Sequence, residues 1–170
     1  PGVSMVTLGE DGKWGMPVTQ IIKDFTIQKG FLGGYWLKDE KTLILTMKSA
    51  GSVGREDLYV TFRDADGTWA KPLHLGNSVN TPGFEISPYY SEEDSILYFA
   101  SNGRDGMGDA DIYRSKRQDE TWTRWSKPCA MPWIPDRWRV LPCLRVCWDS
   151  KPLLRKPVNR WNFLQILIRM

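Results

Sequence analysis

The sequence has 170 residues, of which 41% are hydrophobic and 25% charged, a composition typical of globular proteins rather than disordered or fibrous ones. Its longest strongly apolar stretch, residues 163–168, is far shorter than the roughly 20 residues of a membrane-spanning helix, and no basic-then-apolar signal peptide opens the sequence. The net charge of +3 averages two unlike segments: residues 1–128 carry 15 Lys/Arg against 18 Asp/Glu, and residues 129–170 carry 8 against 2. Since all 15 glycines precede Lys127, we expect a boundary near residue 128 between a domain and a basic tail.

The predicted elements of residues 1–128 are short β runs that recur in a fixed order. A Trp-x-x-Pro signature begins at Trp14, Trp69 and Trp125, at spacings of 55 and 56 residues. Each signature follows a polar turn, and before each turn lies a β-rich run, at residues 3–7, 58–62 and 112–114. Two of the turns contain Asp-Gly, whose backbone tolerates the positive φ of a tight hairpin. No 3.6-residue period is sustained in this region, so helices are not expected.

Each complete unit contains four such β runs. The runs at 34–36 and 43–45 precede the run at 58–62, and we align them with residues 87–89 and 96–98 of the next unit. A recurring four-stranded antiparallel unit of this length is typical of a β-propeller blade, and the recurring tryptophan is then expected to be an apolar wedge between neighbouring blades. The units amount to about two and a half blades, whereas closed propellers have four to eight. We therefore predict an all-β, incomplete propeller that needs its parent chain or other blades to close the ring.

Three stretches carry a resemblance to a known family: NTPGFEISPYY at residues 80–90, LYFASNG at 97–103 and GDADIY at 108–113. They resemble the PD40 family of WD40-like, TolB-type propeller repeats, and a looser likeness covers about residues 2–128. In the first unit Gly34-Tyr35 stands where the family's Ser-Pro would stand. The resemblance implies a non-catalytic domain without cofactors. It would bind protein or cell-wall glycan in the periplasm or at the outer membrane of a bacterial cell envelope.

Two other functions stay open at this point. One is the propeller portion of a hydrolase, either a sialidase-like glycosidase or a serine peptidase, whose catalytic part lies elsewhere. The other is a truncated product without an independent function. The motifs of the repeat belong mostly to its scaffold, and so they predict the fold more specifically than the function.

Residues 129–170 depart from the repeat and form an atypical basic tail that contains Trp, Pro and Cys. It is interpreted either as a capping segment, with residues 161–168 covering an exposed blade edge, or as out-of-frame sequence after a frameshift near codon 128. Cys129, Cys143 and Cys147 lack the spacing and the histidine partners of a zinc site. Basic residues with tryptophans are typical of nucleic-acid-binding patches, but no nucleic-acid partner is predicted.

Few residues of the repeat region could carry chemistry. His74 is the sole histidine and lies in a β run after a Trp signature, where we expect an ordinary strand residue rather than a catalytic base. Asp105, Asp109 and Asp111 lie on a Gly-rich loop of the kind that could hold Ca²⁺, but their order departs from the EF-hand pattern. Asp111 is expected instead to accept backbone hydrogen bonds from the neighbouring loop. We therefore predict no catalytic residue, no metal site and no cofactor.

A ligand of such a propeller is expected where the loop that enters the innermost strand meets the loop that joins the two middle strands. These loops are residues 80–85 and 102–109. Tyrosine and arginine are common anchors of binding interfaces. The candidate contacts are accordingly Tyr89, Tyr90, Arg104 and Asp105.

Overall fold

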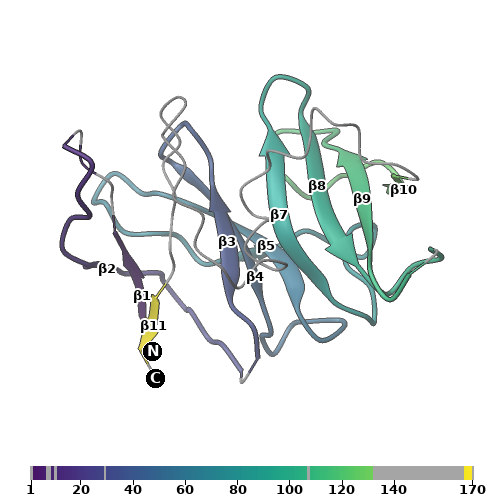
Figure 1. The fold of residues 1–170 in the computed structure, drawn as a ribbon, viewed down its shortest axis with the longest axis horizontal. Helices are drawn as coiled ribbons and strands as arrows, with labels where there is room; N and C mark the ends of the chain where they lie inside the picture. The colour runs from purple at the N-terminus through teal and green to yellow at the C-terminus, as the bar shows by residue number, and fades with distance from the viewer. Residues whose placement is uncertain are drawn as a thin grey trace.

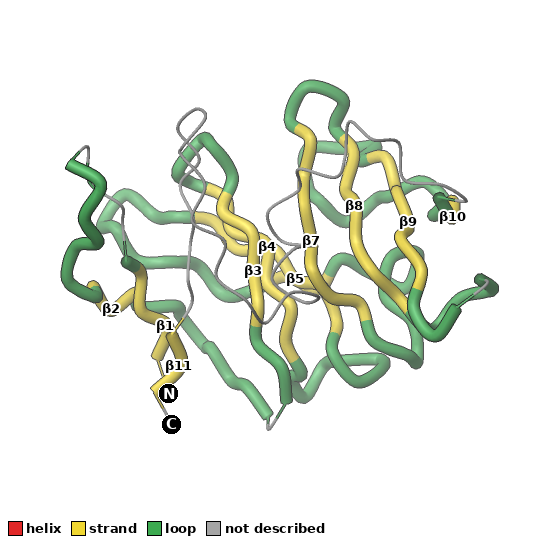
Figure 2. The backbone as a smooth tube through the Cα atoms, viewed as in Figure 1, coloured by secondary structure: helices red, strands yellow, loops and turns green. Residues whose placement is uncertain are grey.

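The computed structural model of the chain describes residues 2–6, 9, 11–28, 30–106, 108–131 and 167–169. Within these ranges all regular structure is β, as Figure 2 shows, and the prediction of an all-β chain is confirmed. The described residues form no helix that could cross a membrane. The strands are β1 (Gly2–Met5), β2 (Val18–Gln20), β3 (Gly33–Trp36), β4 (Thr42–Met47), β5 (Asp57–Phe62), β6 (Leu73–His74), β7 (Glu85–Ser91), β8 (Ile96–Ser101), β9 (Asp111–Lys116), β10 (Cys129–Ala130) and β11 (Leu167–Arg169).

The strands form three antiparallel sheets that follow one another across the molecule (Figure 1). The first sheet has the order β11-β1-β2, the second β3-β4-β5-β6 and the third β10-β9-β8-β7. In the second and third sheets each strand pairs with the next strand along the chain, so the two predicted four-stranded antiparallel units are confirmed. None of these sheets closes on itself within the described ranges.

The second and third sheets have the same register at an offset of 54 residues. Tyr59 of β5 lies opposite Leu45, and Tyr113 of β9 lies opposite Phe99. By the same offset residues 43–45 correspond to residues 97–99, so our sequence alignment of 43–45 with 96–98 was wrong by one residue. All side chains of β4 are buried, and the strand therefore lacks the polar alternation that would have revealed its register.

Alternate side chains of the second sheet enter two separate apolar cores, because both of its faces are covered. The first core lies toward the first sheet and comprises Ile22, Leu32, Leu43, Leu45, Met47, Tyr59 and Trp69. The second core lies toward the third sheet and comprises Leu37, Ile44, Leu58, Val60, Leu75, Val79, Tyr90, Leu97, Phe99, Tyr113, Trp122 and Trp125. This layered burial is what holds adjacent sheets together.

Two of the three recurring tryptophans lie between neighbouring sheets, as predicted. Trp69 is fully buried in the first core, where its ring meets Trp36 edge-on at 5.2 Å, and Trp125 is 5% exposed in the second core. Trp14, at the corresponding position of the first unit, is 52% exposed, so the expectation of a buried wedge was wrong there. The physical reason is that no described sheet precedes the first one.

The hairpin turns explain why the Asp-Gly pairs recur. Gly12 and Gly67 adopt φ values of 75° and 82°, in the left-handed region where a residue without Cβ is favoured. In the second unit the Gly67 N–H donates to the Asp64 carbonyl at 3.0 Å, which closes the turn between β5 and β6. The predicted positive φ is confirmed at both glycines.

Most of the predicted tail lies outside the described residues, including Cys143 and Cys147. Of its first residues, Cys129 and Ala130 form β10 and pair with Arg114 and Tyr113, which completes the third sheet. The short strand β11 pairs with β1 along the edge opposite β2.

Candidate functional site

The structure does not bring the four predicted contact residues together. Tyr89 and Tyr90 are neighbours on β7 and so point to opposite faces of the third sheet. Tyr90 is 4% exposed and packs in the second core, 4.8 Å from the ring of Trp122, while Tyr89 is half-buried and lies 5.1 Å from the ring of Tyr35. Neither tyrosine offers a free ring to a ligand in this arrangement.

The other two predicted contacts lie on the loop between β8 and β9. Arg104 donates from Nη2 to the carbonyls of Ser78 and Val79 at 2.6 and 2.7 Å, and so it fastens this loop to the connection between β6 and β7. The Asp105 side chain is exposed, and its backbone carbonyl accepts a hydrogen bond from the Tyr113 hydroxyl at 2.8 Å. Of the four predicted contacts, Asp105 alone has an exposed side chain.

The two predicted ligand-binding loops do meet. The Phe84 N–H donates to Asn102 Oδ1 at 2.8 Å, and a Cβ added at Gly83 would lie 2.6 Å from the Gly103 nitrogen. However, the polar side chains of the loop at 80–85 point inward, since Asn80 is 1% exposed and Glu85 is fully buried. The expectation that this loop presents a binding surface was therefore wrong for those side chains, and the exposed part is the β8–β9 loop.

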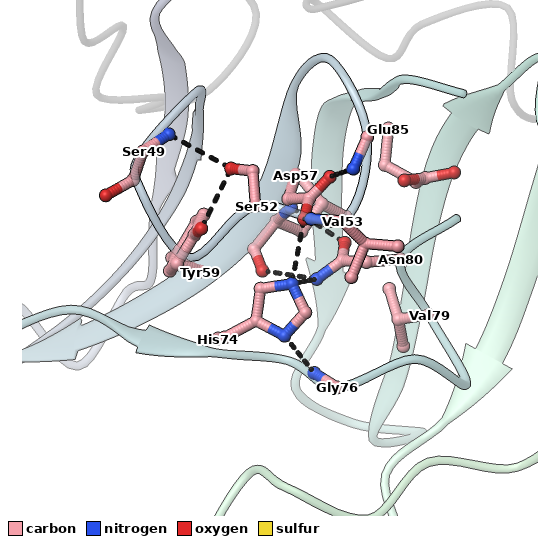
Figure 3. Close-up of polar contacts among 12 residues, drawn as sticks. Ser49, Ser52, Val53, Asp57, Tyr59, His74, Gly76, Val79, Asn80 and Glu85 are labelled. Atoms are coloured by element: carbon pink, nitrogen blue, oxygen red, sulfur yellow. Dashed lines mark hydrogen bonds and ion pairs between the residues drawn. The ribbon is translucent and has the colours of Figure 1, made fainter. Parts of the chain in front are cut away.

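A polar network centred on Asp57 lies beside these loops (Figure 3). Asp57 begins β5, and its carboxylate is fully buried. Its oxygens accept the N–H groups of Val53 at 2.6 Å and Gly54 at 3.2 Å, and Oδ2 lies 2.8 Å from Nε2 of His74. The carboxylate thereby holds the β4–β5 connection and β6 in place, which satisfies a buried charge that would otherwise be costly.

Both ring nitrogens of His74 are occupied in this network. The Gly76 N–H donates to Nδ1 at 3.1 Å, so the imidazole hydrogen belongs on Nε2, which donates to Asp57. Nδ2 of Asn80 lies 2.8 Å from the same Nε2. A Ser-His-Asp triad needs the carboxylate on one nitrogen and a hydroxyl on the other. Because the second nitrogen of His74 is bound to backbone, this arrangement positions loops and activates no nucleophile.

Asn80 and Glu85 extend the network into the β6–β7 connection. The Asn80 amide pairs with both backbone groups of Leu58, accepting its N–H at 2.8 Å and donating to its carbonyl at 3.0 Å, as a strand neighbour would. The Glu85 carboxylate accepts the N–H of Thr81 at 2.9 Å and hydroxyls of Thr81 and Ser101 at 2.5 and 2.7 Å. Burial nevertheless raises the pKa of Glu85 above its ordinary value of 4.5, because desolvation outweighs these donors.

The acidic loop behaves as a turn rather than as a cation cage. Asp111 Oδ2 accepts the Gly108 N–H at 3.1 Å, which confirms the predicted backbone role. Gly54 donates to Asp57 in the same way 54 residues earlier, so this bond is a feature of the repeat. The side chains of Asp105 and Asp109 are exposed, and the described part of the chain contains no group of three or more possible metal ligands.

No protein-family model matches this sequence, and neither curated proteins nor solved structures give a significant match. The likeness to PD40 repeats therefore depends on the sequence motifs alone.

Sequence reasoning missed the roles of His74, Asn80 and Glu85 in one network. Asn80 and Glu85 belong to the motif that carries the family resemblance, and that motif was the available signal. Their spacing of five residues gave no indication that one would pair with β5 and the other with the end of β8. His74 does lie in a strand, as expected, but it also links that strand to the buried Asp57.

Proposed function

We propose that this chain is a β-propeller segment of the PD40 type, a non-catalytic module that binds a protein partner in the bacterial cell envelope. The observation that carries the proposal is the 54-residue correspondence between two four-stranded sheets. Trp69 and Trp125, Asp57 and Asp111, and the glycines that donate to these carboxylates occupy the same places in successive sheets. Repeated units that bury their faces only against one another are typical of propellers.

The exposed part of the candidate site favours a protein partner over a glycan. The β8–β9 loop exposes Asp105 and Asp109, whereas Tyr89 and Tyr90 are packed against other rings. Sugar rings are usually held by open aromatic faces, and an acidic loop is better suited to a basic protein surface. The hydrolase alternative gains nothing from His74, whose two nitrogens are already bound.

Site-specific photo-crosslinking in the bacterium that expresses the chain tests this function. A benzophenone side chain at position 105 is expected to capture one discrete envelope protein. The matched control replaces Glu93, exposed in the turn at the other end of β8, and is expected to capture nothing. Co-sedimentation of the purified chain with peptidoglycan sacculi would instead show a glycan ligand. No crosslink at position 105, or equal crosslinking at both positions, would refute a protein-binding role for this loop.

A further inference from the structure

The first sheet ends in an exposed apolar segment that has a buried counterpart one unit later. Trp14, Met16 and Val18 are 52%, 84% and 57% exposed. Val18 corresponds in register to Leu73, which is also exposed at 44%, so an open side chain is normal at that strand position. Trp14 differs, because its counterpart Trp69 is fully buried. Its exposure therefore indicates a missing neighbour.

The chain itself shows what covers a tryptophan at this position. Trp69 is covered by the segment that follows β2 in the preceding sheet. Its N–H donates to the Ile21 carbonyl and its carbonyl accepts the Lys23 N–H, both at 2.8 Å, while its indole donates to Gln20 Oε1 at 3.1 Å. Lys23 also pairs with Asp64 at 2.6 Å and lies 3.9 Å from Asp66, in the turn before Trp69. A neighbour of the same type would bury Trp14 and bring cations to Asp11, the counterpart of Asp66.

The third sheet offers the complementary end. The face of the second sheet that packs against a following sheet is lined by Ile44, Leu58 and Val60, all fully buried. Fifty-four residues later the corresponding positions are Tyr98, Ile112 and Arg114. Ile112 is only partly buried and Arg114 is exposed, as is Lys116 on the same face of β9. This face thus combines apolar contact area with the positive charge that the Trp14 end, with Asp11, would attract.

We propose that copies of this chain associate head to tail, with the Trp14 end of one copy packed against the outer face of the third sheet of the next. The contact repeats between molecules the packing that the chain already makes twice within itself. It rests on the propeller interpretation of the sheets but not on the envelope partner. Such a contact is heterologous, so each copy uses two different surfaces, and a partner of another kind is not needed to cover Trp14.

Sedimentation velocity of the full chain over increasing concentration tests the association. Wild type is expected to shift from monomer to larger species. Trp14→Ser is expected to weaken the association about thirtyfold or more, as for the loss of a buried aromatic anchor. The control Leu73→Ser changes a similarly exposed side chain outside the contact and should leave the association unchanged. A wild type that stays monomeric throughout, or a Trp14→Ser variant that associates equally well, would overturn the proposal.

Mixing two variants distinguishes this contact from a symmetric one. Ile112→Lys places a charge on the outer face of the third sheet and should also prevent self-association. Circular dichroism confirms that each variant is folded before mixing. A mixture of Ile112→Lys and Trp14→Ser should form a 1:1 complex, because each retains one intact end. If the mixture stays monomeric, the head-to-tail geometry is wrong, whatever crosslinking at position 105 shows about the envelope partner.

Discussion

Replacing Trp69 by alanine should destabilise the fold strongly, whereas the same change at Trp14 should not. A buried tryptophan removes 150–250 Å² from water, and at about 25 cal/mol per Å² this corresponds to about 4–6 kcal/mol. Alanine retains part of that area but leaves a cavity, and we expect a loss of about 3–5 kcal/mol. Since Trp14 is 52% exposed and its site is open, no closed cavity forms and the loss there should be about 1 kcal/mol.

Urea unfolding followed by circular dichroism measures both values, at protein concentrations low enough to keep the chain monomeric. Trp69→Phe provides an intermediate step: it keeps an aromatic ring beside Trp36 but loses the indole bond to Gln20. The order of stability should be wild type, Trp14→Ala, Trp69→Phe and then Trp69→Ala, with similar m-values. Equal losses at Trp14 and Trp69 would contradict the assignment of the recurring tryptophan to the space between sheets.

Three further predictions concern the polar network and its loops. Because burial raises the pKa of Glu85, its contribution to stability is present below pH 4.5 and is lost as pH rises through the folded-state pKa; urea titrations should therefore show Glu85→Gln gaining on wild type from pH 4 to 7, and a constant difference would disprove this. Asp57→Ala removes the acceptor of three buried donors and should cost about 2–4 kcal/mol by urea unfolding, whereas Asp111→Ala, with one printed donor, should cost about 1 kcal/mol; equal costs would contradict the network. Gly54→Ala would place a Cβ against backbone oxygens and should lower the thermal midpoint by several degrees, whereas Gly51→Ala, where a Cβ meets nothing within 4 Å, should change it little; a tolerated Gly54→Ala would show that the crossing of the two loops is misplaced.

The fold could be predicted largely from the sequence because its signals are local. The Asp-Gly turn at Gly67 requires a positive φ, and the β-rich run that begins at Asp57 is long enough to specify a strand on its own. The register of β4 could not be predicted. Its side chains are buried on both faces, and a continuous apolar run is compatible with either of two alignments that differ by one residue. The exposure of Trp14 was also unpredictable, since the same motif is buried wherever a sheet precedes it.

The site was harder to predict because its contacts join residues that the sequence separates. Asn80 acts as a backbone partner of Leu58, 22 positions away, and His74 reaches Asp57 across 17. A motif that is read along the chain makes such residues look like loop ligands, since Asn, Thr and Glu are also the residues that bind ligands. In this fold the same donors and acceptors are used to close a short fourth strand, where β6 pairs with β5 at two positions only. The sheet edge thus needs side chains to complete its hydrogen bonds, and residues engaged in that way are no longer available for a partner. Binding is then left to the side chains that the scaffold does not use, which on the third sheet are those of the acidic β8–β9 loop.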